Sequence, residues 1–234
     1  MPTLYIVATP IGNLEDITLR AIRVLGEVDA ILCEDTRVTS KLLAKYKIQP
    51  FGSAQGRKQL ISYHSHSKLA KVEKVFELLE EGKNLALVSD AGTPCISDPG
   101  VMLVAQVRER FGNEVNIIPI PGPSAVISAL SASGLPSSEF LFLGFLPHKK
   151  GRETLFKEIA ASERTVAFYE SPHRILKALE SLRKFSPEKQ VVIGREITKI
   201  YEEFIFGTAD ELLARFDANK ESVRGEFVVM VKAL

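Results

Sequence analysis

The polar segment Glu34-Asp35-Thr36-Arg37 directly follows the short apolar run Ala30–Cys33. Two carboxylates beside a guanidinium can supply a general base and an anchor for a substrate. The same residue types also begin helices, because Asp35 or Thr36 can accept hydrogen bonds from free backbone N–H groups and Arg37 can pair with a neighbouring carboxylate. Both interpretations stay open from the sequence.

A long loop dense in Gly, Pro, Ser and Asp runs from Ser89 to Gly100, directly after the apolar run Leu85–Val88. Small residues let a ligand approach backbone N–H and C=O groups closely, which favours a binding loop over a plain connection. Two shorter segments, Thr9–Asn13 and Pro121–Ala125, have the same character. Within the second of them, Ser124 suits a helix cap and a ligand contact equally well.

Two further polar segments follow apolar runs in the second half of the chain. Tyr169–Arg174 gathers an aromatic ring, a carboxylate, an imidazole and a guanidinium around one turn, and Arg195–Lys199 is similar in composition. Ordinary capping explains either segment alone, but two polar-ended strands in one domain favour a shared cleft.

A basic turn, Lys149-Lys150-Gly151-Arg152, and the pair His64 and His66 complete the candidate residues. Basic turns are usually only solvated, but they also attract phosphates, and this electrostatic contribution dominates nucleic-acid affinity. The two imidazoles would share one face of an extended segment. Because no Cys or carboxylate is suitably spaced, we expect polar surface or RNA contact there and no metal.

Five apolar runs in the first half predict the strands that position these loops. They are continuous rather than alternating, which favours a parallel sheet covered on both faces, and ligands of such sheets bind beyond the carboxyl ends of the strands. Asp16, Ser67 and Pro99 suit helix starts, and Gly82 suits a helix stop. The predicted strands are Leu4–Ala8, Ala30–Cys33, Gln59–Tyr63, Leu85–Val88 and Val115–Ile120.

The second half has a different pattern and predicts a separate domain. A helix is expected over Ser124–Ala132, and the last three strands come with few helices between them, so this sheet should be mixed. We therefore expect two α/β domains, 1–120 and 121–234. The predicted strands are Phe140–Phe145, Thr165–Tyr169, Gln190–Ile193, Ile200–Phe206 and Phe227–Val231.

The composition is that of an ordinary globular protein. Of the 234 residues, 45% are hydrophobic and 25% charged, which excludes disorder, and a net charge of +1 excludes a uniformly basic nucleic-acid clamp. Two cysteines form no disulfide framework. With no signal-peptide pattern at Met1 and no apolar run of membrane-spanning length, we expect a cytoplasmic protein.

The common nucleotide and hydrolase motifs (the phosphate loop, the dinucleotide fingerprint and the nucleophile elbow) are absent from the sequence. Instead, seven segments in order resemble the tetrapyrrole methylase superfamily, and within it the group of ribosomal RNA small subunit methyltransferases I. These segments are Val7–Leu14, Glu34–Arg37, Ala86–Pro94, Pro121–Pro123, Gly144–Pro147, Phe168–Arg174 and Arg195–Lys199.

The resemblance implies two α/β domains, the first with a mostly parallel sheet and the second with a mixed one, with S-adenosylmethionine in the cleft between them. It also implies a homodimer that methylates the ribose 2′-oxygen of a cytidine in the decoding region of small-subunit (16S) rRNA, free or in the assembled 30S subunit. Relatives that act on porphyrinoids have Gly-Asp-Pro where this chain has Ser89-Asp90-Ala91, which favours the RNA branch.

Site residues follow from the resemblance position by position. The implied cofactor contacts are Pro10, Asp90, Thr93, Ser124, Ala125, Tyr169, Ile197 and Gly225. The polar set expected around the acceptor oxygen is Glu34, Asp35, Arg37, Glu170, His173, Arg195, Glu196 and Lys199. Of these, Glu170 or Asp35 is the expected base, and Arg37 or Lys199 would stabilise the developing alkoxide. The expected RNA contacts are Lys149, Lys150 and Arg152, with Arg57 and Lys58 as further candidates.

Two other functions remain open at this stage. One is methylation of a small molecule or a protein side chain, because the superfamily includes both. The other is a non-catalytic RNA-binding or ribosome-assembly factor that keeps the cofactor pocket only for stability.

Overall fold

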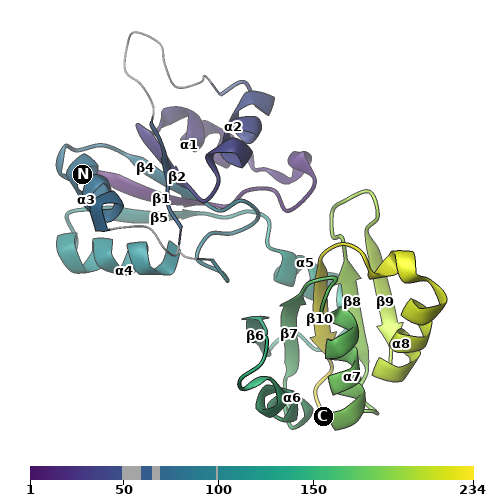
Figure 1. The fold of residues 1–234 in the computed structure, drawn as a ribbon. Helices are drawn as coiled ribbons and strands as arrows, with labels where there is room; N and C mark the ends of the chain where they lie inside the picture. The colour runs from purple at the N-terminus through teal and green to yellow at the C-terminus, as the bar shows by residue number, and fades with distance from the viewer. Residues whose placement is uncertain (49–58, 65–68, 99) are drawn as a thin grey trace. The chain divides into compact units, whose positions relative to one another are not determined.

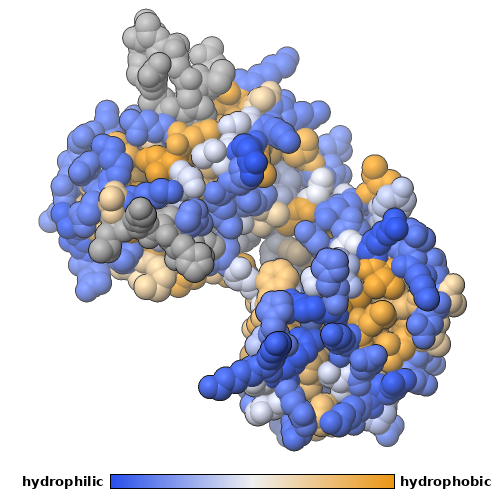
Figure 2. Space-filling view, in the orientation of Figure 1, coloured by the Kyte–Doolittle hydropathy of each residue, from blue (hydrophilic) through white to orange (hydrophobic). Residues whose placement is uncertain are grey.

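A computed structural model describes residues 1–48, 59–64, 69–98 and 100–234, which form two compact units, Met1–Ser124 and Ala125–Leu234 (Figure 1). The predicted boundary at residue 120 lies a few residues earlier. No helix among the described residues is long and apolar enough to cross a membrane. On the viewed face, most of the surface of both units is hydrophilic, with separate apolar patches (Figure 2).

The first unit contains a five-stranded sheet whose pairs are all parallel, as predicted. The strand order is β3-β2-β4-β1-β5. Every residue of β2 and β4 is buried, which explains why these segments are continuously apolar. The strands are β1 (Thr3–Val7), β2 (Ala30–Cys33), β3 (Gln59–Ser62), β4 (Leu85–Val88) and β5 (Asn116–Ile120).

Helices cover both faces of this sheet (Figure 1). Alternate strand residues point to opposite faces. Ile31 and Val88 pack with α1 (Leu19–Glu27) and α2 (Thr36–Lys45). Leu32 and Leu87 pack with α3 (Leu69–Glu80) and α4 (Gly100–Phe111). The layered arrangement leaves the loops at the strand ends as the places where a ligand can reach the backbone.

The helix starts differ in part from those predicted. Asp16 lies in a 3-10 turn, η1 (Leu14–Asp16), and the Thr18 hydroxyl caps α1 by accepting a hydrogen bond from the Ala21 N–H at 3.1 Å. The expectation that Asp16 caps this helix is therefore wrong, because the extra turn moves the helix start to Leu19. Gly82 follows α3 with a φ of 79°, which confirms the predicted stop. The predicted starts at Ser67 and Pro99 lie outside the described residues.

The second unit contains a mixed sheet, as predicted. Its strand order is β6-β7-β10-β8-β9. Only β6 and β7 pair in parallel. The strand expected to begin at Ile200 begins at Glu203, because the preceding residues form a turn. The strands are β6 (Phe140–Phe145), β7 (Thr165–Glu170), β8 (Val191–Arg195), β9 (Glu203–Gly207) and β10 (Phe227–Val231).

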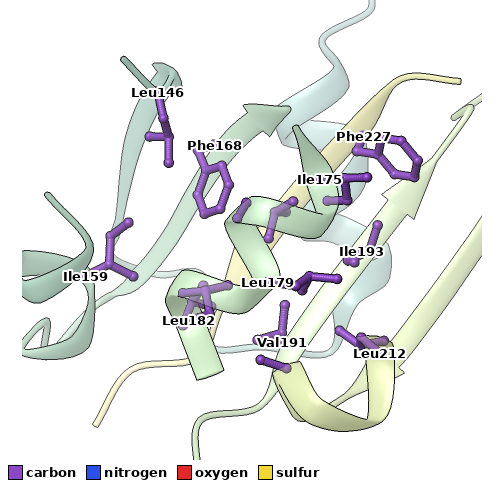
Figure 3. Packing of buried hydrophobic residues seen from close by; sticks show 14 of the residues in the cluster. Leu146, Ile159, Phe168, Ile175, Leu179, Leu182, Val191, Ile193, Leu212 and Phe227 are labelled. Atoms are coloured by element: carbon purple, nitrogen blue, oxygen red, sulfur yellow. The ribbon is translucent and has the colours of Figure 1, made fainter. Parts of the chain in front are cut away.

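The helices of this unit pack on both sides of the mixed sheet. The shared core of α6 (Arg152–Ala160), α7 (Ile175–Phe185) and α8 (Ala209–Ala218) lies on one face, where Phe168, Leu179 and Ile193 meet (Figure 3). Besides these, α5 (Ala125–Ser133) contacts β7, β8 and β10, and the 3-10 turn η2 (Lys220–Val223) follows α8. The expectation of few helices among the last strands missed α8, which a Thr208–Glu211 capping box begins.

The aromatic residues of this sheet allow a direct test of the core. Phe168 is 0% exposed, whereas Phe206 on β9 is 51% exposed. We predict that Phe168→Ala lowers the free energy of unfolding by about 3–5 kcal/mol, because it removes buried contacts and leaves a cavity. Chemical denaturation measures this, and Phe206→Ala is the matched control, expected to change it by about 0.5 kcal/mol or less. Equal losses in both variants would contradict the core assignment.

Candidate functional site

The loops that follow β1 and β4 are joined by backbone hydrogen bonds at the carboxyl edge of the parallel sheet. Thr9 N–H donates to Gly92 O at 2.9 Å, and Gly92 N–H donates to Thr9 O at 3.1 Å. The Thr9 hydroxyl also donates to Ser89 O at 3.0 Å. This pairing fixes the start of the Ser89–Gly100 loop against the Thr9–Asn13 loop, with Pro10 buried beside it.

The loop after β5 joins the same edge. The Thr93 hydroxyl donates to Pro123 O at 2.9 Å, and a β-carbon at Gly122 would lie only 2.9 Å from the Ala8 β-carbon. The small residues seen in the sequence are therefore required for close backbone approach. The structure thus brings together Pro10, Asp90, Thr93 and Ser124, which precedes α5 directly.

The acidic residues after β2 and β4 also meet at this edge. Asp90 Oδ1 accepts a hydrogen bond from the Asp35 N–H at 3.0 Å. Asp35 is the N-cap of α2, and Arg37 donates to both of its carboxylate oxygens. The side-chain and backbone hydrogen bonds from Arg37 lower the pKa of Asp35 to about 2. Asp35 therefore fulfils the capping interpretation, and it stays ionised but weakly basic.

Glu34 has the opposite electrostatic environment. Burial raises the pKa of its carboxyl group, and the negative charges of Asp90 and Asp98 raise it further. A carboxylate with a raised pKa holds a transferred proton better than an ordinary one. Of the two adjacent carboxylates, Glu34 is therefore the stronger base and Asp35 the weaker one.

The rest of the Ser89–Gly100 loop is strained and contains an acceptor without a donor. Cys95 and Ser97 have φ values of 69° and 63°, in the left-handed region that non-glycine residues rarely adopt. Asp98 Oδ1 accepts from the Gly100 N–H at 2.9 Å, but Asp98 Oδ2 is buried and has no hydrogen-bond partner among the described residues. Sequence reasoning missed Asp98, since only its burial distinguishes it from the other loop residues.

The surroundings of the Cys95 thiol favour its protonated form. Burial, followed by the nearby charge of Asp98, raises its pKa to about 11, so the thiolate is scarce at neutral pH. Among the described residues, no group of three or more His, Cys, Asp and Glu side chains could hold a metal ion. His66 of the histidine pair lies outside the described residues.

In the second unit, an ion-pair network holds the turn after β8. Lys199 Nζ donates to Glu196 Oε1 at 2.9 Å and to Glu226 Oε2 at 3.0 Å, and the Glu226 N–H donates to Glu196 Oε1 at 2.9 Å. Burial alone would raise the pKa of Glu196, but the hydrogen bonds from Lys199 and Glu226 outweigh it and lower that pKa. The network therefore keeps Glu196 ionised and Lys199 bonded to carboxylates.

This turn leaves no room for a side chain at Gly225. Glu196 and Thr198 have φ values of 49° and 69°, and Gly225 has a φ of 97°. A β-carbon at Gly225 would lie 2.5 Å from Glu196 Cγ, and one at Gly194 would lie 2.8 Å from Ile197 Cδ1. The structure thus groups Glu196, Ile197 and Gly225 around one strained turn.

Arg195 and Tyr169 are each held by backbone groups. Arg195 Nε donates to Arg224 O at 2.8 Å, and its guanidinium pairs with Glu203 at 3.2 Å. The Tyr169 hydroxyl accepts from the Val126 N–H at 3.2 Å, which brings Tyr169 to the start of α5 beside Ala125. Burial raises the pKa of Tyr169, so its hydroxyl is neutral.

Both carboxylate oxygens of Glu170 pair with arginines, and the residues of the basic turn near it differ in exposure. Its side chain is 0% exposed and pairs with Arg152 at 3.2 Å and Arg174 at 2.8 Å. Lys149 and Lys150 are exposed, whereas the Arg152 side chain is only 15% exposed. These contacts hold the half-buried Arg152 against Glu170, and two guanidinium groups occupy the Glu170 carboxylate. His173 is exposed.

The chain thus consists of two α/β units, one built on a parallel sheet and one on a mixed sheet. The family model for tetrapyrrole (corrin/porphyrin) methylases matches residues 3–213, and the chain belongs to this family. The solved structure of the methyltransferase CobJ is similar, with a TM-score of 0.69 and 19% identity over 100% of this chain and 95% of that one.

Two further proteins are similar to this chain over nearly its full length. The chain is 45% identical to the ribosomal RNA small subunit methyltransferase I of Thermotoga maritima, over 99% of this chain and 98% of that protein. A uroporphyrin-III C-methyltransferase from Thermus thermophilus, solved with S-adenosylhomocysteine, is similar with a TM-score of 0.62 and 16% identity, over 99% of this chain and 97% of that one.

Two effects on stability at Gly225, the close contact with Glu196 and the positive φ, can be measured separately. We predict that Gly225→Ala lowers the free energy of unfolding by about 1–2 kcal/mol for the left-handed conformation. Displacing Glu196 costs about 1–3 kcal/mol more. Gly134→Ala is the matched control, because Gly134 has a φ of 68° and nothing within 4 Å of its added carbon. Equal losses, measured by urea unfolding, would show that the Glu196 turn can move at no cost.

Proposed function

We propose that this protein transfers a methyl group from S-adenosylmethionine to the ribose 2′-oxygen of a cytidine in the decoding region of small-subunit rRNA. The observation that carries the proposal is the 45% identity, over nearly the full length of both chains, to a relative named ribosomal RNA small subunit methyltransferase I. The chain has Ser89-Asp90-Ala91 at the place where the resemblance implies Gly-Asp-Pro in relatives that act on porphyrinoids. This difference supports an RNA substrate over a tetrapyrrole.

The residues at the carboxyl edge fit the cofactor. The joined loops of Pro10, Asp90, Thr93 and Ser124 allow close backbone approach, and the buried Asp98 Oδ2 offers an acceptor to a hydroxyl or ammonium donor. When bound, S-adenosylmethionine supplies an electrophilic methyl group on a sulfonium. In the second unit, Ala125, Tyr169, Ile197 and Gly225 complete the proposed cofactor contacts.

Glu34 is the proposed proton acceptor for the ribose hydroxyl. A ribose hydroxyl is a poor nucleophile while protonated, and removal of its proton is worth roughly 10²–10⁴-fold in rate. Arg37, whose side chain is 86% exposed and pairs with Asp35, is the proposed cation that stabilises the developing alkoxide. Holding the acceptor oxygen in line supplies a further large part of the acceleration, roughly 7–11 kcal/mol at most.

Lys149 and Lys150 are the proposed phosphate contacts. Both are exposed on the basic turn, and a net charge of +1 leaves local clusters as the source of RNA affinity. A homodimer that joins two such turns, acting on the assembled small subunit in the cytoplasm, agrees with this low charge.

The direct test uses methyl-labelled S-adenosylmethionine and small ribosomal subunits from cells that lack this gene. We expect label on one cytidine ribose, mapped by nuclease digestion and mass spectrometry. Label on ribosomal protein, or on added porphyrinoid only, would replace the proposal with methylation of another acceptor. Cofactor and subunit binding without any transfer would instead indicate a non-catalytic assembly factor.

Glu34→Gln tests the proton acceptor, because the variant should lose turnover but gain stability. Turnover should fall by roughly 10²–10⁴-fold if Glu34 takes the proton. The variant should be more stable than the wild type at pH 7. Because the pKa of Glu34 is higher in the folded protein than its ordinary value of 4.5, the ionised carboxylate lowers the free energy of unfolding as pH rises above 4.5. The variant should lack this decline in denaturation curves from pH 4.5 to 7.

Asp35→Asn is the matched control for that experiment. It keeps Glu34 and removes an ionised carboxylate that already pairs with Arg37, so turnover should fall less than in Glu34→Gln. Wild-type turnover in Glu34→Gln, together with a large loss in Asp35→Asn, would transfer the role of base to Asp35.

The two lysines are tested by the salt dependence of subunit binding. We predict that Lys149→Ala/Lys150→Ala weakens binding and reduces the slope of log K against log salt by roughly 0.7–0.9 per lysine. Lys83→Ala/Lys220→Ala, in exposed positions elsewhere, keeps the net charge matched. If both double variants changed the slope of log K against log salt equally, the net charge of the protein, and not the basic turn, would determine subunit binding.

A further inference from the structure

We propose that Glu170 is a positioning residue that, through Arg152 and Arg174, holds the basic turn Pro147–Arg152 in the orientation in which Lys149 and Lys150 meet RNA phosphates. The inference rests on the proposed function for the role of the lysines. It gives Glu170 a part in substrate binding rather than in proton transfer.

Each arginine bonds both the carboxylate of Glu170 and the backbone where the turn begins. Arg152 donates to Glu170 Oε2 at 3.2 Å and to Pro147 O at 3.2 Å. Arg174 pairs with Glu170 Oε1 at 2.8 Å and donates to Leu146 O at 2.9 Å. One buried carboxylate thus ties two successive carbonyls to the end of β7.

The turn has few other attachments among the described residues. Residues Pro147–Gly151 are exposed, Gly151 has a φ of 81°, and the Arg152 N–H donates to Lys149 O at 3.2 Å. Within the part of the chain that the structure describes, Lys149 and Lys150 make no ion pair, and their ammonium groups face solvent. The orientation of the lysines therefore depends on the arginine contacts at the base of the turn.

The geometry requires arginine and an ionised carboxylate. The planar guanidinium presents several N–H donors in a fixed fork, so one side chain can bond a carboxylate and a carbonyl together. A lysine in place of Arg152 keeps the charge but offers a single ammonium for both partners. The carboxylate also offsets both positive charges, and the arginine side chains, at 15% and 16% exposure, are mostly covered, whereas Lys149 and Lys150 are exposed.

The experiment compares Glu170→Gln and Arg152→Lys with the control Glu139→Gln, which breaks an exposed ion pair with Arg164 in the same unit. Amide hydrogen exchange of residues 148–152 reports the turn directly, without RNA. Kinetics with small subunits, after transfer by the wild type is established, then separate KM for the subunit from kcat.

We expect faster exchange in the turn and a KM raised on the order of tenfold in both variants, with kcat and the affinity for S-adenosylhomocysteine near wild type. The control should change neither. If Glu170→Gln does not fold, Arg152→Lys still decides the matter, because it retains the buried charge balance.

Three results would overturn the inference: a fall in kcat at constant KM, unchanged exchange in the turn, or equal effects in Glu139→Gln. A wild-type protein that transfers no methyl group to subunits would refute the proposed function instead. The exchange measurement would still test the positioning by Glu170.

Discussion

The backbone pairing of Thr9 with Gly92 is the constraint on which the candidate site depends. It joins the loops after two neighbouring parallel strands, and the Thr93–Pro123 hydrogen bond adds the loop after a third. Because a parallel sheet gathers its carboxyl ends at one edge, this pairing turns three separate loops into one rigid surface. The strained Cys95 and Ser97 persist there only because the surrounding contacts hold them.

In the second unit, ion pairs hold the corresponding loops in place. Lys199 bridges Glu196 and Glu226, and these bonds hold two non-glycine residues in left-handed conformations while Gly225 leaves space for the Glu196 side chain. Glu170 does the same for the basic turn through two guanidiniums. In each place one buried or largely buried carboxylate, Glu196 or Glu170, bonds the cations. These polar residues therefore shape the loops, whereas exposed residues such as Lys149 and Lys150 are free to contact a substrate.

The sequence alone predicts the strands well where burial is continuous, as in Ala30–Cys33 and Leu85–Val88, and it predicts the parallel and mixed sheets. It could not place the N-cap of α1 at Thr18 or the late start of β9, because local turns compete there with equally suitable caps. It also could not distinguish Arg152 from Lys149, since the pairing of Arg152 with Glu170 joins residues distant in sequence. Nor could it recognise Asp98, because the burial of its Oδ2 atom is a property of the folded loop. The roles of the individual site residues stay predictions.

Amide hydrogen exchange with and without S-adenosylhomocysteine tests the central claim, that the joined loops hold the cofactor, most directly. The account predicts protection of residues 9–13, 89–98 and 121–124 in the first unit, and of 195–199 and 225 in the second, with α3 and α8 unchanged. Tight binding that leaves these loops unprotected, or that protects the helices instead, would contradict it.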